Sequence, residues 1–474
     1  MQIVEARHGL KPFNPPGPKG RPVVGNLIEF RRDKLAFFTR CARDYGDLAR
    51  FHIGSRPVVL LSDPAMIEQV LAMQQRNFVK HFVLSLLRPV LGEGLVTSDG
   101  EFWLRQRRLI QPAFQRSLIE TYAGTMVSLT ERMLAEWQAG DERDLHAEMM
   151  HLTLGITAKA LLDADVSGSE FHCVAHALEL LMRDFVYRFE GIVKIPLWMP
   201  TLWNWRVKHQ IRKLDRVIYG IIDRRRRGPL DGDDLLTGLM QARDAGAEQP
   251  GGRGAMTNRQ LRDEVMTLFL AGHETTANAM SWTGLLLAQH PEVEARLQAE
   301  LQTVLNGRSP TAADVPRLVY TEQVITESMR VYPPVYAVGR RSIRPCEIGG
   351  FDVPEGTTFL MSQWVLHHDP RYFDSPLEFR PERWADGLGK RIPKFAYFPF
   401  GGGPRLCVGN SFAMLEAVLI LATMAQRFRF ELVPGQRIVP WATVTLRPKH
   451  GIRVVCRPVE SAKPALSSGE PQPK

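Results

Sequence analysis

Cys407 is the residue of this chain best placed for metal chemistry. It lies in the run Phe400-Gly401-Gly402-Gly403-Pro404-Arg405-Leu406-Cys407-Val408-Gly409, with glycines on both sides and Arg405 two positions before it. A thiolate in a partly apolar place needs hydrogen-bond donors and nearby positive charge, and glycines let backbone N–H groups approach an anion closely. The run therefore predicts a protected cysteine that presents one thiolate to a metal.

The remaining cysteines show no such context. Cys41, Cys173, Cys346 and Cys456 are scattered, and no two of them have a CxxC or zinc-type spacing. An odd total of five in 474 residues, with no secretory leader in the sequence, argues against a disulfide framework. We interpret these four as ordinary small residues, buried or at the surface.

A long predicted helix carries the second group of candidate residues. Apolar periodicity covers 258–289, Thr257 and Gln260 fit a capping box at its start, and Pro291 follows its end. A helix of about 32 residues is about 48 Å long and would cross the whole molecule.

The run Ala271-Gly272-His273-Glu274-Thr275-Thr276 lies in the middle of this helix. Gly272 and Thr275 are three residues apart and share a helix face, where they would open a small polar notch for a diatomic ligand and water. An ordinary helix kink with a back-bonded threonine accounts for the same residues equally well.

Glu327 and Arg330 form an i,i+3 pair of opposite charges just before Tyr332-Pro333-Pro334. Apolar neighbours indicate burial, where such a pair needs a third polar partner, and Arg383 is the available candidate. We interpret Glu327 and Arg330 as a structural lock rather than as catalytic residues.

The elements that must position these residues are mostly helices. Helical periodicity covers 33–45, 64–74, 101–111, 116–138, 145–163, 169–189, 206–227, 232–243, 258–289, 291–305, 319–331 and 408–428. Strand-like alternation is confined to 48–53, 57–61, 335–361, 428–433 and 443–457. The fold class is therefore mainly α with small β-sheets.

Domain organisation and location follow from composition. No long linker divides the middle of the chain, although 245–255 reads as a surface loop, and the polar stretch 461–474 is expected to be a disordered tail. The N-terminal segment has neither a signal-peptide core nor about 20 apolar residues in succession. We therefore expect a soluble, cytoplasmic protein that touches a membrane peripherally at most.

The charge balance favours acidic partners. The formal net charge is +9 and the isoelectric point is near 9.4. The run Arg224 to Arg227 is followed directly by Gly228-Pro229, so we interpret it as a solvated helix end. Nucleic acid is not expected as a partner.

In this order, these pieces resemble the cytochrome P450 family of thiolate-haem monooxygenases, in its soluble bacterial form. The matching motifs are Trp103-Leu104-Arg105-Gln106-Arg107, Ala271 to Thr276, Glu327-x-x-Arg330 with Pro381-Glu382-Arg383, and the Phe400 to Gly409 loop. The likeness covers nearly the whole chain. It implies one P450 haem domain over 1–460, with the long central helix over the haem.

The resemblance also assigns the cofactor-binding residues. It makes Cys407 the axial thiolate of a b-type haem, and such a ligand pushes electron density onto the iron and favours O–O cleavage. Trp103, Arg107, Arg405 and Arg340 would bind the haem propionates by charge-assisted hydrogen bonds, with Arg341 as the alternative to Arg340. Phe400 would pack under the sulfur, and Ala271 would lie beside the haem.

On the opposite side of the haem, Glu274 and Thr275 resemble the acid and alcohol pair that delivers protons during oxygen activation. Substrate-contacting positions of the family correspond here to apolar residues, and these imply a lipophilic substrate: Val90, Leu91, Val335, Val338 and Trp441. A fatty acid, a terpenoid or a steroid-like molecule would fit.

By the same resemblance, the segment 185–207 would cover the substrate entrance. Its mixture of Trp and basic residues would suit a lipid surface, and a lid that packs on itself explains the mixture as well. The 67 residues after Cys407 leave no room for a fused reductase. Electrons from NAD(P)H are therefore expected to arrive through a separate ferredoxin or flavodoxin and its reductase, and a monomer is expected.

Three other functions would use parts of the same pattern. A peroxygenase, or an isomerase or dehydratase, on the same haem would not need the proton delivery that Glu274 and Thr275 imply. A non-catalytic haem sensor would not need a substrate lid. A phosphate-binding loop at Gly401 to Gly403 lacks both the GxGxxG pattern and the preceding strand.

Overall fold

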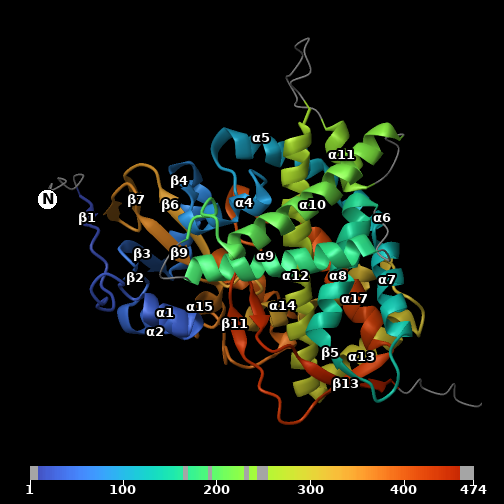
Figure 1. Ribbon diagram of the computed structural model, residues 1–474. Helices are drawn as coiled ribbons and strands as arrows, with labels where there is room; N and C mark the ends of the chain where they lie inside the picture. The colour runs from blue at the N-terminus through green and yellow to red at the C-terminus, as the bar shows by residue number, and fades with distance from the viewer. Residues whose placement is uncertain (1–8, 164–168, 191–194, 229–233, 243–254, 460–474) are drawn as a thin grey trace, which may run out of the picture.

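The computed structural model describes residues 9–163, 169–190, 195–228, 234–242 and 255–459. Helices make up most of it, and the β-strands of the N-terminal part gather on one side (Figure 1). The predicted class, mainly α with small sheets, is confirmed. The tail 461–474 and most of the loop 245–255 lie outside the described residues.

One long helix, α12 (Asn258–Gln289), runs through the middle of the molecule (Figure 1). The predicted capping box is present, since Gln260 N–H donates to the Thr257 hydroxyl at 3.2 Å and Thr257 N–H donates to the Gln260 side chain at 2.8 Å. Most residues of α12 are buried, as expected for a helix surrounded by other helices. It packs most extensively on α8 (Leu145–Leu162).

The other helices surround this axis. They are α1 (Leu27–Arg32), α2 (Lys34–Tyr45), α3 (Pro64–Glu68), α4 (Arg88–Leu91), α5 (Gly100–Ile110), α6 (Arg116–Thr121), α7 (Ala123–Ala135), α9 (Ser169–Glu190), α10 (Leu202–Arg227), α11 (Leu235–Gln241), α13 (Pro291–Leu305), α14 (Val319–Val331), α15 (Gln363–His367), α16 (Leu388–Arg391) and α17 (Asn410–Ala425). Short segments of 3₁₀- or π-helix occur at η1 (Gln69–Met73), η2 (Gln75–Asn77), η3 (Phe82–Leu87), η4 (Gln111–Phe114), η5 (Ala312–Arg317), η6 (Pro381–Trp384), η7 (Lys394–Ala396) and η8 (Gly403–Arg405).

Helix ends follow local chemistry. The observed α13 and α14 have the predicted bounds, whereas α10 begins four residues before the predicted 206. Its start is fixed by Thr201, whose hydroxyl accepts a hydrogen bond from Asn204 N–H at 3.1 Å. The predicted single helix over 116–138 is divided into α6 and α7.

The largest sheet has five strands in the order β2 (Leu48–Ile53), β3 (Arg56–Leu61), β9 (Thr358–Met361), β6 (Val338–Ser342) and β4 (Phe78–Lys80). Strands β3 and β9 are parallel and the other neighbours are antiparallel. The sequence did not predict β4, because a three-residue strand is defined by its pairing with β6 and not by its own alternation.

Three smaller sheets complete the fold. One contains β1 (Lys11–Pro12), β8 (Phe351–Val353) and β7 (Cys346–Ile348), and another contains β10 (Phe428–Leu432), β13 (Arg453–Pro458) and β5 (Glu142–Asp144). The third is the hairpin of β11 (Pro440–Ala442) and β12 (Leu446–Pro448). Its tip, residues 443–445, reaches the middle of α12.

The charged lock predicted around Glu327 is present and fully buried. Its carboxylate accepts hydrogen bonds from Arg330 Nε and Nη2 at 2.9 Å, Arg383 Nε at 2.8 Å and Trp384 Nε1 at 2.9 Å. Arg330 also donates to the carbonyls of His367, Pro376 and Glu378. The lock therefore joins α14 to η6 and to the segment after α15.

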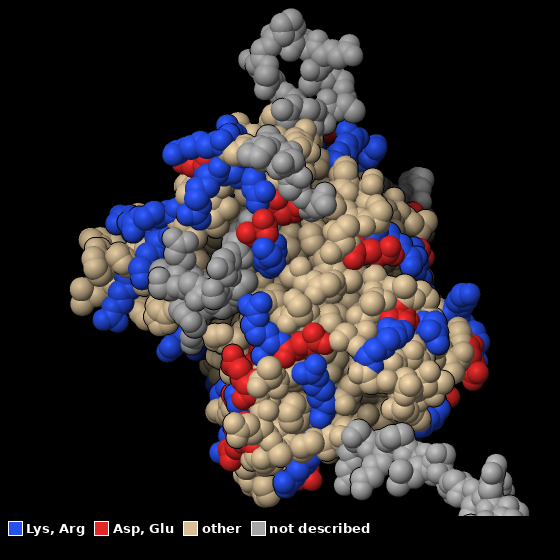
Figure 2. Space-filling view, turned by 90° about the vertical axis from the view of Figure 1, so that its right-hand side faces the viewer, with Lys and Arg blue, Asp and Glu red and all other residues tan. Residues whose placement is uncertain are grey.

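None of the described helices combines the length and apolarity needed to cross a membrane. On the face in Figure 2, Lys and Arg side chains gather toward one upper edge, and elsewhere basic and acidic groups lie side by side. The excess of positive charge is therefore spread unevenly over this face.

Candidate active site

The loop before α17 holds Cys407 in a fixed conformation. Cys407 N–H donates to the Phe400 carbonyl at 3.0 Å, which closes the loop around η8. Gly403 has a φ of +67°, and a Cβ there would collide with the backbone of Leu71. A Cβ on Gly402 would collide with the Phe395 ring. Packing, as well as donor geometry, therefore requires these glycines.

The thiol of Cys407 experiences opposing electrostatic effects. Burial raises its pKa, and this effect outweighs the N–H group of Gly409 and the positive charge of Arg107, which both lower it. The side chain nevertheless keeps accessible surface, although protein atoms crowd it closely. Both facts suit a sulfur that lines an enclosed space. The Gly409 N–H group and the Arg107 charge can stabilise its thiolate form.

Helix α5 brings the predicted Trp103 and Arg107 to this region. Trp103 is buried, and the Arg405 guanidinium lies over its ring at 4.9 Å. Lys80 Nζ lies 5.9 Å from the same ring. Arg405 forms an ion pair with Asp99, at the start of α5. These residues come from three separate parts of the sequence.

Strand register decides between Arg340 and Arg341. Both lie in β6, where neighbouring side chains point to opposite faces. Arg340 is the inner one, since its side chain is deeply surrounded by protein atoms. This burial, followed by the charge of Arg405, lowers its pKa to about 10. Arg341 is exposed and turned away. The inward arginine is thus Arg340.

Lys80 is a member of this cluster that the sequence did not reveal. It pairs with Arg340 across β4 and β6, and its Nζ donates to the carbonyls of Leu95 and Ser98 at 2.6 Å. Burial lowers its pKa to about 7, and Arg405 contributes in the same direction. Only the pairing of β4 with β6 could have indicated it.

The middle of α12 presents one accessible face inside an otherwise buried helix. Ala271 is exposed and Thr275, one turn later, is half-buried, while most of the helix on either side is buried. The Thr275 hydroxyl donates to the Ala271 carbonyl at 2.7 Å, as in the back-bonded alternative. Val408, beside Cys407, packs against the same hydrophobic cluster as Leu268 and Phe269 of α12.

Gly272 does not form the notch that the sequence suggested. A Cβ at this position would meet Thr157 of α8 at 3.2 Å, so Gly272 faces the neighbouring helix. Its small size serves the close approach of α8 and α12. The accessible face is formed by Ala271 and Thr275 instead.

Glu274 is buried and held by the tip of the β11–β12 hairpin. Thr445 Oγ1 donates to Glu274 Oε1 at 2.6 Å, and Asn278 Nδ2 donates to Thr445 Oγ1 at 3.2 Å. This short polar chain fixes a carboxylate one residue before Thr275. The sequence did not indicate Thr445 or Asn278, because the hairpin is remote from α12 along the chain.

The predicted substrate-contacting residues come from three elements. Val90 and Leu91 end α4 and are buried in the cluster that contains Leu268 of α12. Val335 and Val338 are half-buried at and before β6. Trp441 is half-buried in β11, where Arg447 lies over its ring at 4.7 Å.

A polar latch joins the two helices of the predicted lid. Asp184 of α9 accepts hydrogen bonds from Trp203 Nε1 at 2.6 Å and from Arg188 Nε at 2.7 Å. Arg188 also donates to Asn204 of α10 at 2.6 Å. Trp198, Leu202 and Trp205 remain exposed outside this latch. Residues 191–194 of the segment lie outside the described residues.

The residues present fit a thiolate-bound haem. The cations Lys80, Arg340 and Arg405 outnumber the described carboxylates that act on them, which are Asp99 and, at Lys80, Glu264. The region can therefore accept further anionic groups. Within the described ranges, no three His, Cys, Asp or Glu side chains form a metal site. A metal bound through one thiolate therefore needs a ligand framework of its own, and a porphyrin with two carboxylates meets both requirements.

Comparison with known proteins gives the same family over nearly the full length. A family model described as cytochrome P450 matches residues 15–454. Cyclooctatin synthase of Streptomyces melanosporofaciens is 36% identical, over 90% of this chain and 92% of that protein. Cyclooctat-9-en-7-ol 5-monooxygenase of the same organism is 35% identical over 88% and 90%, and pentalenene oxygenase of Streptomyces avermitilis is 32% identical over 92% and 96%.

Solved structures share the fold. The retinoic acid-bound cyanobacterial CYP120A1 has a TM-score of 0.83 at 27% identity, covering 95% of this chain and 100% of that one. A cytochrome P450DA haem domain has a TM-score of 0.85 at 26% identity, covering 94% and 97%.

Proposed function

This chain belongs to the cytochrome P450 family and is a haem-containing monooxygenase, and from that premise we propose that it inserts one oxygen atom of O2 into a terpenoid. The observation that supports this substrate class is the naming of two relatives as oxygenases of cyclooctat-9-en-7-ol and pentalenene, both terpenoids. The apolar residues Val90, Leu91, Val335, Val338 and Trp441 suit such a molecule, which would be oriented mainly by shape.

In this proposal, Cys407 ligates the iron, and the cations hold the two propionates. Arg340, Arg405 and Lys80 supply charge, Arg107 stabilises the thiolate, and Trp103 supplies an N–H group and a packing surface. Phe400 and Ala271 bound the site on its two sides. When bound, haem supplies the iron at which O2 is activated, and a thiolate ligand favours O–O cleavage.

Glu274 and Thr275 handle protons in the proposed mechanism. The Thr275 hydroxyl donates its hydrogen to Ala271, so its oxygen is free to accept a hydrogen bond from water on the accessible side. The Glu274 carboxylate belongs to the preceding residue, is held by Thr445 and would exchange protons with the Thr275 hydroxyl through water. The pair therefore positions water and supplies protons without covalent chemistry.

We further propose that electrons from NAD(P)H reach the enzyme through a separate ferredoxin or flavodoxin and its reductase. The net charge of +9 favours an acidic donor of this kind. Substrate and electron donor would then bind independently.

The substrate class can be tested by optical titration of the purified haem protein. We expect terpenoid hydrocarbons and alcohols to shift the iron spin state at micromolar concentrations, and fatty acids and steroids to bind roughly tenfold more weakly or not at all. Because shape complementarity governs apolar pockets, the ranking should follow skeleton size.

The Cys407→Ser variant, measured with reduced iron and carbon monoxide, provides the control. It should lose the red-shifted carbon monoxide band that a thiolate ligand produces. A band that survives this substitution would refute Cys407 as ligand, and preferential binding of fatty acids or steroids would refute the terpenoid assignment.

A further inference from the structure

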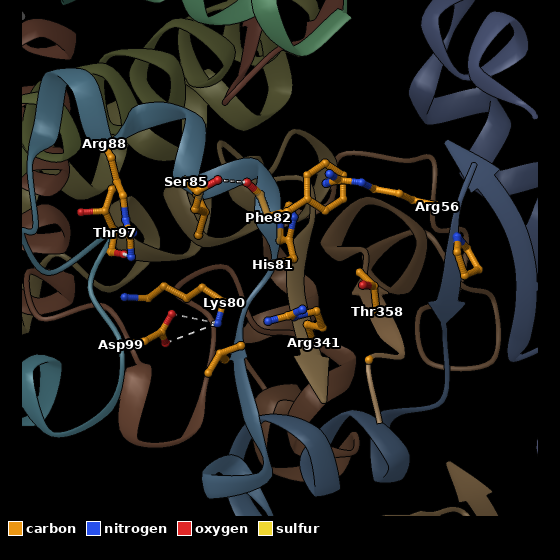
Figure 3. Close-up of a pocket in the computed structure, with 14 residues that line it drawn as sticks. Arg56, Lys80, His81, Phe82, Ser85, Arg88, Thr97, Asp99, Arg341 and Thr358 are labelled. Atoms are coloured by element: carbon orange, nitrogen blue, oxygen red, sulfur yellow. Dashed lines mark hydrogen bonds between the residues drawn. The ribbon is translucent and has the colours of Figure 1, made fainter. Parts of the chain in front are cut away.

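A second binding region adjoins the candidate active site and shares Lys80 and Asp99 with it. It is a cavity of about 620 Å³ between the five-stranded sheet and the segment of η3 and α4 (Figure 3). Strands β3, β4, β6 and β9 form one wall, and residues 82–88 form the other. Its volume is in the range of small-molecule sites.

Positive charge dominates this cavity. Arg56, Lys80, Arg88 and Arg341 all line it, and Asp99 is the one carboxylate among the described lining residues. Asp99 is already engaged, because it forms an ion pair with Arg405 and accepts hydrogen bonds from Lys80 N–H. The cavity therefore has an excess of positive charge that no lining acid neutralises.

Three guanidinium groups that line the cavity have N–H donors available for a ligand. Among the described residues, the Arg341 guanidinium has no hydrogen-bond or ion-pair partner, and the Arg56 guanidinium contacts the Phe82 ring, 4.2 Å away. Arg88 makes one long hydrogen bond, 3.4 Å, to the Thr97 carbonyl. Figure 3 shows these side chains reaching the cavity from different sides. Guanidinium groups bind carboxylates in bidentate geometry.

The cavity is distinct from the cluster around Arg340. Strand β6 places Arg340 and Arg341 on opposite faces, and Arg341 pairs in register with Val79, another lining residue. Lys80 borders both regions, and its Nζ donates to the carbonyls of Leu95 and Ser98. The exposed Arg56, Arg88 and Arg341 therefore lie outside the cluster that we assign to the haem propionates.

Apolar side chains line the same cavity. Phe82, Leu84, Val79 and Pro57 provide a surface for a hydrocarbon body beside the arginines. We propose that this cavity binds an amphipathic organic acid, with its carboxylate at Arg56 and Arg341 and its hydrocarbon body against Phe82 and Leu84. This site does not require the ligand to be the molecule that is oxidised.

The test compares two probes that differ only in their head group. Calorimetric titration of the haem-loaded protein with farnesoate and with farnesol should show farnesoate binding at least tenfold more tightly. Arg341→Gln and Arg56→Gln should each reduce this preference roughly three- to tenfold, since each removes a charge-assisted contact at an exposed site. Raising the salt concentration should reduce it as well.

Arg344→Gln is the matched control, because Arg344 is exposed, lies three residues from Arg341 and does not line the cavity. Equal binding of the two probes, or a preference that survives both arginine substitutions, would overturn the proposal. Displacement of farnesoate by equimolar inorganic phosphate would also overturn it, because it would show an anion site without apolar recognition.

The carbon monoxide spectrum separates this proposal from the function above. If the thiolate band is present in all these variants and the farnesoate preference is absent, only the organic-acid site fails. If the wild-type protein lacks the thiolate band, the haem-thiolate assignment fails, whatever the titration shows.

Discussion

Two neighbouring threonines of α12 have different surroundings despite their adjacency. Thr275 is half-buried on the accessible face and donates to Ala271, whereas Thr276 is buried and donates to Gly272 at 3.3 Å. Sequence alone could not separate them, because either hydroxyl could occupy the polar position in the run. The helix rotation, fixed by packing on α8, assigns the accessible hydroxyl to Thr275.

Thr275→Ala should uncouple oxygen consumption from product formation. A positioned proton donor or acceptor contributes roughly 10²- to 10⁴-fold to a rate, so product formed per electron pair should fall about tenfold or more while hydrogen peroxide rises. The measurement is product and peroxide per NAD(P)H oxidised. Thr276→Ala is the matched control and should stay near the wild-type ratio; full coupling in Thr275→Ala would contradict the proton role.

At the scale of elements, the Glu327 lock shows how one carboxylate organises several segments. Arg330 and Arg383 converge on it, and Arg380 N–H adds a further hydrogen bond at 3.0 Å. A buried charge network of this kind tolerates no missing member, because the remaining charges stay desolvated. The lock connects α14 with the chain that leads to the Cys407 loop.

Glu327→Gln should destabilise the fold by about 3–5 kcal/mol, because it leaves two buried arginines without a counter-charge. We expect a lower urea midpoint and reduced haem retention. Glu322→Gln on the same helix is the control, since Glu322 is exposed. If both variants unfold at the wild-type urea concentration, the lock contributes no net stability.

Elements marked by caps, prolines and periodicity could be predicted from the sequence. Elements that depend on pairing or packing with a distant segment could not. Helices α13 and α14 begin and end where proline, caps and periodicity indicate. Strand β4 has three residues and exists through its pairing with β6, so Lys80 was missed and Arg340 could not be separated from Arg341. The sequence left a ligand notch at Gly272 and an ordinary helix kink as equal alternatives, because it does not reveal which helix packs against this glycine.

At the scale of the whole molecule, the central helix and the five-stranded sheet converge on a region with more cations than anions. Lys80, Arg340 and Arg405 come from positions spread over most of the chain, and Asp99 offsets part of their charge. Folding without the cofactor brings these cations together at an electrostatic cost. Haem binding should therefore stabilise the whole protein, beyond the contacts at the iron.

In the haem-free protein, this electrostatic cost should appear in the pH dependence of the free energy of unfolding. Burial lowers the pKa of folded Lys80 to about 7, whereas a lysine in the unfolded chain titrates near 10.4. Between these values the unfolded chain binds more protons, so Lys80 makes the free energy of unfolding rise with pH, by at most about 1.4 kcal/mol per unit. Below pH 7 both states carry the proton and this contribution no longer changes.

Urea unfolding from pH 7.5 to 9.5 gives the slope of the free energy of unfolding against pH. The contribution of Lys80 is the difference between the slopes of the wild type and of Lys80→Met. The exposed Lys390→Met is the control and should keep the wild-type slope, because its side chain is solvated in both states. In the haem-loaded protein the difference should vanish, since propionate carboxylates would keep Lys80 protonated. A wild-type slope that persists in haem-free Lys80→Met would show that Lys80 is not the titrating group. A slope difference that survives haem loading would place the propionates elsewhere.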